Sequence, residues 1–199
     1  MAGYLIGGRS GAGTAIGAAI GTAVGSGAGY LIGKKMDKAK AAAQQVANAQ
    51  VETVQDANGL QAVKVTFDSG ILFNTGSSAL SPSAQSSLIS FANNVLKQNT
   101  DMDCAIQGYT DNQGWKGSTA AESVQKNQAL SLQRAQAVST YLIGQGVSSS
   151  QIKSVEGLGE ANPVADNSTA VGQQQNRRVE VFLYASKAMI DAANAGTLQ

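Results

Sequence analysis

The amino-acid sequence predicts an α/β (α+β) sandwich, a mixed β-sheet with helices on one face, preceded by a glycine-rich helical segment. Two observations carry this prediction. From about residue 59 onward, short stretches typical of strands alternate with longer stretches whose apolar residues recur three and four positions apart. Such alternation is typical of domains in which each helix packs back onto a sheet. The order of the elements, βαβαβ and then a last strand, implies that parallel and antiparallel strands share the sheet.

The first elements are a strand and a helix. Residues 62–67 predict the strand, because polar and apolar side chains alternate along them, and residues 71–73 are expected to continue it after a bend. Pro82 suits the first turn of the helix, with Ser81 as its N-cap. The helix is expected to end near residue 98, and its apolar stripe consists of Leu88, Phe91, Ala92, Val95 and Leu96.

The second half of the domain also alternates between predicted strands and helices. Residues 103–107 predict a strand, in which Cys104 is expected to be an inert, buried thiol. A long helix is expected over residues 120–144, because glycines follow its last apolar positions. Two further strands and a terminal helix are predicted at residues 151–156, 179–183 and 187–195.

Composition excludes several classes of function. The net charge is +1, so nothing points to nucleic acid as a partner. The chain has no histidine, which removes the commonest general base and metal ligand. Its single cysteine excludes an intrachain disulfide and a cysteine-rich metal site. No cofactor and no catalytic residue are therefore expected, and the chain is not predicted to be an enzyme.

The N-terminal segment is rich in glycine. Residues 10–33 carry no charge, and from residue 13 a glycine recurs at every fourth position. On a helix these glycines share one face, where a second helix can approach closely. We expect a glycine-zipper helix or hairpin in or on a membrane, which also favours homo-oligomers; a flexible linker is the alternative, because glycine weakens a helix by about 1 kcal/mol per residue relative to alanine. The glycines are Gly13, Gly17, Gly21, Gly25, Gly29 and Gly33.

Four parts of the chain are predicted from these patterns. Residues 1–33 are the glycine-zipper segment, and residues 34–58 are an Ala/Gln/Lys-rich helical spacer that is helical to about residue 54. Residues 59–185 are the α/β domain, and residues 186–199 are a C-terminal helix and tail. No secretory signal peptide is recognisable after Met1. A cytosolic chain and a chain whose leader has been removed are both compatible with this, and the second fits the other features better.

Four motifs carry a resemblance to a known family. In order along the chain they are Gly108-Tyr109-Thr110-Asp111, Asn127 with Leu130-Ser131 and Arg134-Ala135, Gly157-Leu158-Gly159 with Pro163, and Asn176-Arg177-Arg178-Val179-Glu180. Together they resemble the OmpA-like C-terminal domain, with its pattern G-[HY]-T-D, N-x-x-L-S-x-x-R-A, G-x-G-x-x-x-P and N-R-R-V-E. The glycine repeat resembles the segments that precede such domains in outer-membrane lipoproteins. The stretch between Asp111 and Asn127 is several residues longer than the family pattern and carries Gly114-Trp115-Lys116.

The resemblance implies a binding site for the diaminopimelate of Gram-negative peptidoglycan, without covalent chemistry. Asp111 would accept the ammonium on the distal carbon of diaminopimelate, and Arg134 would hold the carboxylate there with its planar guanidinium. Thr110, Asn127 and Leu130 would line the pocket.

The Asn176-Arg177-Arg178 cluster is the last part of this site. The resemblance implies that Arg178 pairs locally to position the network, with Asn176 and Arg177 as further contributors. Each charged residue also has a local explanation, as a turn cap, a helix surface or a solvated strand entry. The presence of all four motifs in family order argues against these explanations.

A non-enzymatic tether is the function that these inferences favour. The chain would bind peptidoglycan through its domain and the outer membrane through its N-terminal segment, facing the periplasm and supporting the integrity of the envelope. The alternative is an oligomeric membrane scaffold built by the glycine zipper, with wall binding secondary. A proton-driven assembly is disfavoured, because residues 10–33 hold no ionisable side chain.

Overall fold

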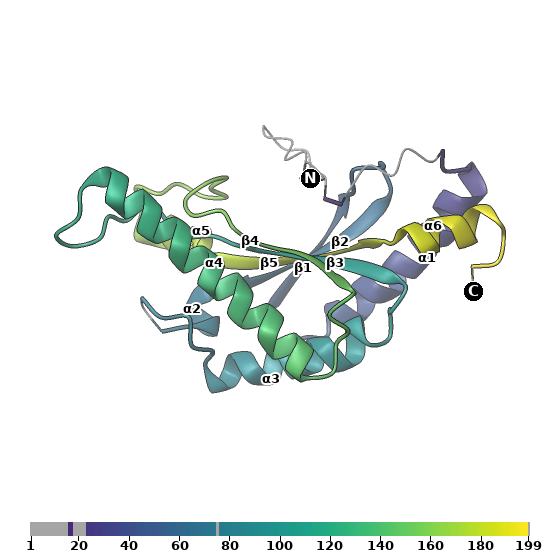
Figure 1. Ribbon diagram of the computed structural model, residues 1–199, viewed down its shortest axis with the longest axis horizontal. Coiled ribbons are helices and arrows are strands. Elements are labelled where there is room, and N and C mark those ends of the chain that lie inside the picture. Colours follow the sequence, from purple (N-terminus) through teal and green to yellow (C-terminus); the bar gives the residue numbers. More distant parts are fainter. Residues whose placement is uncertain (1–15, 18–22, 75, 199) are drawn as a thin grey trace.

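The computed structural model describes residues 16–17, 23–74 and 76–198. Five strands form one sheet in the order β1-β2-β5-β3-β4 (Figure 1). Only β3 and β4 pair in parallel among these neighbours, so the sheet is mixed, as predicted. The strands are β1 (Ala49–Gln55), β2 (Gln61–Asp68), β3 (Met102–Gly108), β4 (Ile152–Gly157) and β5 (Arg178–Ala185).

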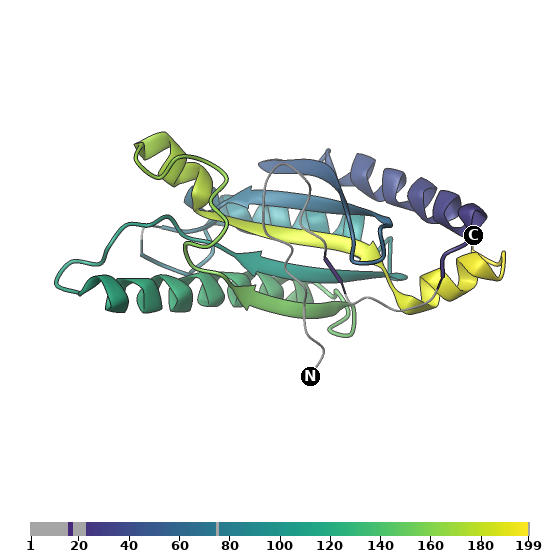
Figure 2. The ribbon, with the colours of Figure 1, turned by 90° about the horizontal axis from the view of Figure 1, so that it is seen from above.

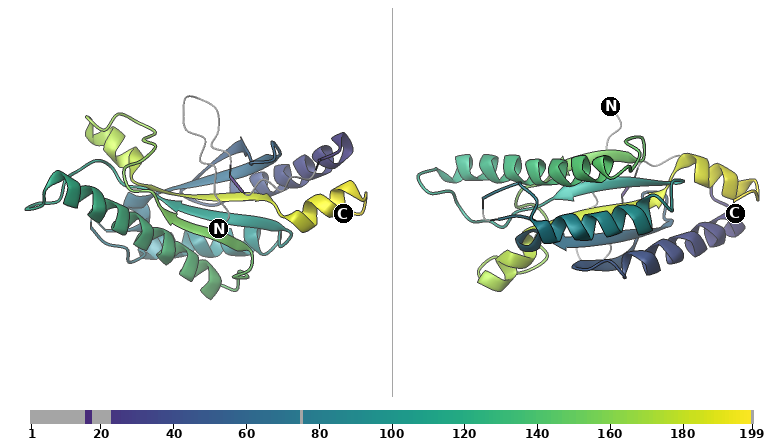
Figure 3. Two further views of the ribbon diagram at one scale, coloured as in Figure 1. Left: turned by 45° about the horizontal axis from the view of Figure 1, so that its top comes forward. Right: turned by 90° about the horizontal axis from the view of Figure 1, so that it is seen from below.

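Helices form the second layer. Figure 3 shows α4, α3 and α1 lying across one face of the sheet, and α6 beside α1 at its end. The N-cap of α3 is Ser81, whose hydroxyl accepts from the Ala84 amide, as its sequence predicts. The helices are α1 (Ser26–Ala43), α2 (Ser69–Leu72), α3 (Pro82–Phe91) with its continuation η1 (Ala92–Leu96), α4 (Ala120–Gly144), α5 (Ala170–Asn176) and α6 (Lys187–Asn194).

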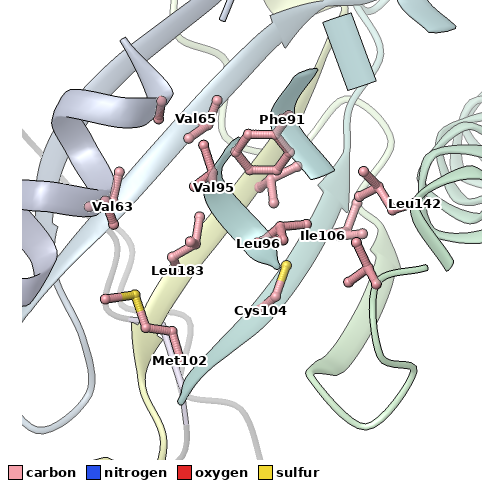
Figure 4. Packing of buried hydrophobic residues seen from close by; sticks show 14 of the residues in the cluster. Val63, Val65, Phe91, Val95, Leu96, Met102, Cys104, Ile106, Leu142 and Leu183 are labelled. Carbon is pink, nitrogen blue, oxygen red and sulfur yellow. The ribbon is translucent and has the colours of Figure 1, made fainter. Parts of the chain in front are cut away.

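The main core lies between this face of the sheet and the helices. Alternate residues of β2, β3 and β5 point into it and meet Phe91, Leu96 and Leu142 from the helices (Figure 4). Cys104 is fully buried there, and burial raises the pKa of its thiol to about 12. The prediction of an inert core thiol is thus confirmed. The described part of the structure therefore has helices on the apolar side of its sheet.

The opposite face of the sheet is more polar. It has a small apolar cluster around Phe182 and Tyr184 that includes Ile16. Ile16 forms a bridge with Asp56, and its carbonyl accepts from the Ala57 amide at 2.8 Å. This contact joins the described residues 16–17 of the glycine-rich segment to the sheet.

Two predictions of local structure were wrong. Residues 71–73 do not extend the first predicted strand, because the chain turns through α2, with the Asp68 carboxylate accepting from the Gly70 amide at its start. The predicted helical spacer ends at Ala43, and residues 49–55 form β1, an edge strand that pairs with β2. Most of the seven residues of β1 are exposed, which gives a weak periodic signal.

The glycines of the four-residue repeat do not all lie on one helix. Gly29 and Gly33 lie in α1, and Gly25 is its N-cap. Gly17 is not helical, because its φ is +93°, and a Cβ at this position would lie 3.0 Å from the Tyr184 ring. Gly13 and Gly21 lie outside the described residues. Within the described ranges, none of the helices is long and apolar enough to cross a membrane.

Candidate functional site

A cavity of about 710 Å³ opens at one end of the sheet. The loop before α4, α5 and α2 lie together at this end, on the left in Figure 1 and again in the view from above in Figure 2. Antiparallel pairing of β2 with β5 sets the end of one strand, Asp68, opposite the start of the other, Arg178. Six of the predicted site residues line this cavity, namely Thr110, Asp111, Asn127, Leu130, Arg134 and Arg177.

Asp111 is the single carboxylate in the lining of this cavity. It is buried, and its Oδ1 accepts from the Gln113 amide at 3.1 Å. Its Oδ2 forms an ion pair with the Arg177 guanidinium, whose side chain is 34% exposed. Asp111 and Arg177 thus pair with each other in the cavity wall, and the sequence did not predict this ion pair.

Arg134 projects from the middle of α4 into the same cavity. Its side chain is largely buried, its Nε donates to the Ser77 carbonyl at 3.1 Å, and its guanidinium lies 5.2 Å from the centre of the Phe73 ring. Burial lowers the pKa of this guanidinium, followed by repulsion from Arg177, while Asp111 opposes the shift. An arginine remains charged in spite of such a shift. A buried cation without its own carboxylate favours an anionic ligand group.

Asn127 holds the long loop that precedes α4. Its side-chain NH₂ donates to the Gln113 carbonyl at 3.1 Å, and its Oδ1 accepts from the Trp115 indole at 2.8 Å. Ser123 adds a hydroxyl that accepts from the Trp115 amide at 3.0 Å. The two bonds place Trp115 at the wall of the cavity, where its backbone and ring are fixed to α4.

Close contact between α4 and the strand ends explains the glycines of two motifs. A Cβ on Gly108 would lie 2.1 Å from the Ser131 carbonyl oxygen, and one on Gly157 would lie 2.3 Å from the Leu132 nitrogen. The Ser131 hydroxyl also accepts from the Gly159 amide at 2.9 Å. The motif residues thus seat α4 directly against the ends of β3 and β4, and so fix Arg134 relative to Asp111.

Asn176 and Arg178 do not line the cavity, although both belong to the fourth motif. The Asn176 side chain is buried and binds the loop before α5 through the Val164 and Ala165 amides. The Arg178 guanidinium donates to Glu180 at 2.7 Å and stacks 3.8 Å from the centre of the Tyr109 ring. Arg178 is therefore a local partner of its own strand, while Arg177 is the member of the cluster that reaches the site.

Two hydroxyls in the cavity wall have no partner. The Oγ atoms of Ser69 and Thr110 are buried and accept or donate no hydrogen bond within the described residues. Buried polar atoms of this kind are rare in folded proteins and commonly mark a place for a water or a ligand. Thr110 lies on the loop after β3, and Ser69 is the first residue of α2.

Sequence patterns missed the part of the wall that comes from other elements. Ser69, Gly70 and Phe73 follow β2, and Gln173 belongs to α5, which was not predicted. The Gln173 side-chain carbonyl accepts from Gln113 at 2.9 Å across the cavity mouth. These residues reach the cavity because β2 pairs with β5, which places Ser69 beside Arg177. The Ser69 amide donates to the Arg177 carbonyl there.

The arrangement offers groups of both charges that can bind a small charged ligand. The cavity holds one carboxylate and three cations, Lys116, Arg134 and Arg177. Within the described ranges, no group of three or more histidine, cysteine, aspartate or glutamate side chains could hold a metal ion. One carboxylate facing a guanidinium fits a ligand that carries an ammonium and a carboxylate together.

Comparison with known families gives two matches. Residues 72–177, more than half of the chain, match the model described as the OmpA family. Residues 1–40 match a model described as a glycine zipper.

Individual relatives agree with the family match. The chain is 40% identical over 119 residues to "Probable lipoprotein YiaD" of Escherichia coli (strain K12), an alignment covering 60% of this chain and 50% of that protein. It is 37% identical over 122 residues to the peptidoglycan-binding protein ArfA of Mycobacterium tuberculosis (strain H37Rv), covering 61% of this chain and 34% of that protein. The chain thus spans half or less of the length of these two relatives.

A solved structure shares the fold. The MotB-like protein from Desulfovibrio vulgaris superposes with a TM-score of 0.62 at 22% identity, over 80% of this chain and 96% of that one. At this identity the likeness concerns the fold alone, and it confirms the predicted mixed sheet with helices.

Proposed function

The chain belongs to the OmpA family, and on this premise we propose that it is a non-enzymatic tether that binds the stem peptides of peptidoglycan. The observation that carries the proposal is the meeting of Asp111 and Arg134 in one cavity, although they lie on separate elements. The relative ArfA, whose name describes it as peptidoglycan-binding, supports the same ligand.

Diaminopimelate supplies the groups that the cavity lacks. Its distal carbon carries an ammonium for Asp111 and a carboxylate for the planar guanidinium of Arg134. The unpartnered hydroxyls of Thr110 and Ser69 are available to the same ligand. A lysine in place of diaminopimelate keeps the ammonium and lacks the carboxylate, so the cavity should discriminate between the two kinds of cell wall.

A tether of this kind works through many weak bonds. A single partly exposed ion pair contributes on the order of 1 kcal/mol, and charge-assisted hydrogen bonds somewhat more. Many copies on one membrane, facing a polymer with many stem peptides, hold firmly while each bond exchanges. We place the chain at the outer membrane, facing the periplasm and attached through its N-terminal segment, and its role is the integrity of the envelope.

The first experiment is co-sedimentation of the full chain with purified sacculi of the diaminopimelate type and of the lysine type. Wild type should pellet with the first kind only. Asp111→Asn removes the charge that pairs with the ammonium, and Arg134→Lys keeps a cation but loses the planar two-pronged grip. Each should lower the bound fraction about tenfold, because a lost charge-assisted bond costs about 1.5 kcal/mol or more.

Asp191→Asn is the matched control, since Asp191 is exposed on α6 at the far end of the sheet and pairs with Lys187. It should pellet as wild type does. Equal pelleting with both kinds of sacculi, or unchanged binding by both cavity variants, would refute the clamp.

An oligomeric membrane scaffold is the second candidate, and the glycine-zipper match favours it. Gly25, Gly29 and Gly33 lie along one side of α1, next to its buried stripe. A Cβ on Gly29 would meet no atom within 4 Å. A second helix could therefore approach this side while α1 stays packed on the domain.

A further inference from the structure

The charges that line the cavity do not balance. Three cations, Lys116, Arg134 and Arg177, face the single carboxylate of Asp111. The zwitterion of the proposed function uses one charge of each sign, at Asp111 and Arg134. Two cations, Lys116 and Arg177, then remain in the cavity wall without a ligand group.

Arg177 and the ammonium of the ligand would share the one negative charge of Asp111. Both Asp111 oxygens are already occupied, Oδ1 by the Gln113 amide and Oδ2 by Arg177. An ammonium on Asp111 therefore competes with the guanidinium. The Arg177 backbone is held on both sides, because its amide donates to the Gln173 carbonyl and its own carbonyl accepts from the Ser69 amide. The Arg177 guanidinium therefore stays at the cavity, where its positive charge is only partly balanced once the ammonium shares Asp111.

Lys116 lies on the loop beside Trp115, which two hydrogen bonds fix to α4. It is exposed, and no ion pair joins it to a carboxylate of the described residues. Lys116 and Arg177 line the same cavity, so together they offer positive charge for a second anionic group of the ligand.

We propose that this second position binds another carboxylate of the same stem peptide, so that the cavity distinguishes a free carboxylate from its carboxamide. This inference rests on the proposed function. The free α-carboxyl of a γ-linked glutamate next to diaminopimelate is a group of this kind. Its amide still accepts a hydrogen bond but carries no charge, and charge-assisted bonds are about twice as strong as neutral ones.

Two synthetic tripeptides test the proposal by titration calorimetry with the full chain. Both contain alanine, γ-linked D-glutamate and meso-diaminopimelate, with the main-chain carboxyl of diaminopimelate blocked as an amide. They differ only in the glutamate α-carboxyl, which is free in one and a carboxamide in the other. A third peptide with lysine in place of diaminopimelate tests the proposed function itself. Wild type should bind the free-acid peptide about tenfold tighter than the amide, and the preference should shrink as salt is added.

Variants separate recognition from structure. Arg177→Gln should abolish most of the tenfold preference yet bind the amide peptide at least as tightly as wild type, because Asp111 no longer has a competing partner. Lys116→Gln should lower the preference by a smaller factor. Lys126→Gln is the control, since Lys126 lies near the same loop, over the Trp115 ring, but does not line the cavity.

Each outcome decides between the two ideas. If wild type binds the acid and the amide equally well, or if Arg177→Gln weakens both by the same factor, the second carboxylate position is refuted while the clamp stands. If wild type binds neither diaminopimelate peptide, or binds the lysine peptide as well as its matched partner, the proposed function itself fails.

Discussion

Single residues in the motifs either line the cavity or hold neighbouring elements together. Charged positions could be predicted from sequence, since an isolated carboxylate and arginines in a fixed order are visible there. Their pairing could not, because the ion pair between Asp111 and Arg177 depends on α5 and the start of β5. The glycines Gly108 and Gly157 appear in the sequence only as members of two motifs, and the structure shows that their missing side chains admit the backbone of α4.

Replacing Gly108 by alanine should lower the free energy of unfolding by about 3 kcal/mol, because the new Cβ would overlap the Ser131 carbonyl and force α4 off the strand ends. Urea unfolding measures the change. Gly144→Ala, at the last residue of the same helix, meets nothing within 4 Å and should change stability by less than about 0.5 kcal/mol. Equal effects of the two substitutions would contradict the close packing of α4 on β3.

At the scale of elements, prediction succeeded where local signals agree. The expected bounds of the long helix match α4, because Thr119 and Glu122 form a capping box at its start and Gly146, with φ +89°, follows its end. It failed where local signals are weak. Strand β1 is exposed on most positions, and α5 is seven residues long with a glycine inside, so neither has a clear apolar period.

Helix α1 carries glycines that its own fold does not need. Gly27 and Gly29 are both helical and both open around the position of a Cβ. Leucine at either position should therefore raise stability, by up to about 1 kcal/mol from helix propensity. Only Gly29 belongs to the four-residue stripe, so Gly29→Leu should also reduce self-association of the full chain in detergent, while Gly27→Leu should not. Sedimentation velocity measures the self-association of both variants, and urea unfolding measures their stability. No self-association by wild type would remove the scaffold from consideration.

For the whole molecule, the predicted division into zipper, spacer and domain does not match the way the chain packs. The predicted boundary near residue 59 follows a stretch, residues 34–54, whose Ala/Gln/Lys-rich composition indicated a polar spacer helix. Burial of such a helix depends on partners distant in sequence. In the structure α1 packs against β2, η1 and α6, and Asn194 of α6 accepts from the Gly25 amide at 3.2 Å.

The folded unit should therefore include α1, and Ile32 tests this directly. Ile32 is fully buried in the main core, from within the predicted zipper, and Met36 lies beside it from within the predicted spacer. Ile32→Ala should lower the free energy of unfolding by about 3 kcal/mol, since it removes buried methylene groups and leaves a cavity. Tyr30→Ala, two residues away on the same helix and 72% exposed, should change it by less than about 0.5 kcal/mol. Were α1 a detached spacer, chemical denaturation would find both substitutions equally silent; a large loss for Ile32 alone means that α1 is part of the folded unit, so that the last residues of the glycine-rich segment unfold together with the α/β domain.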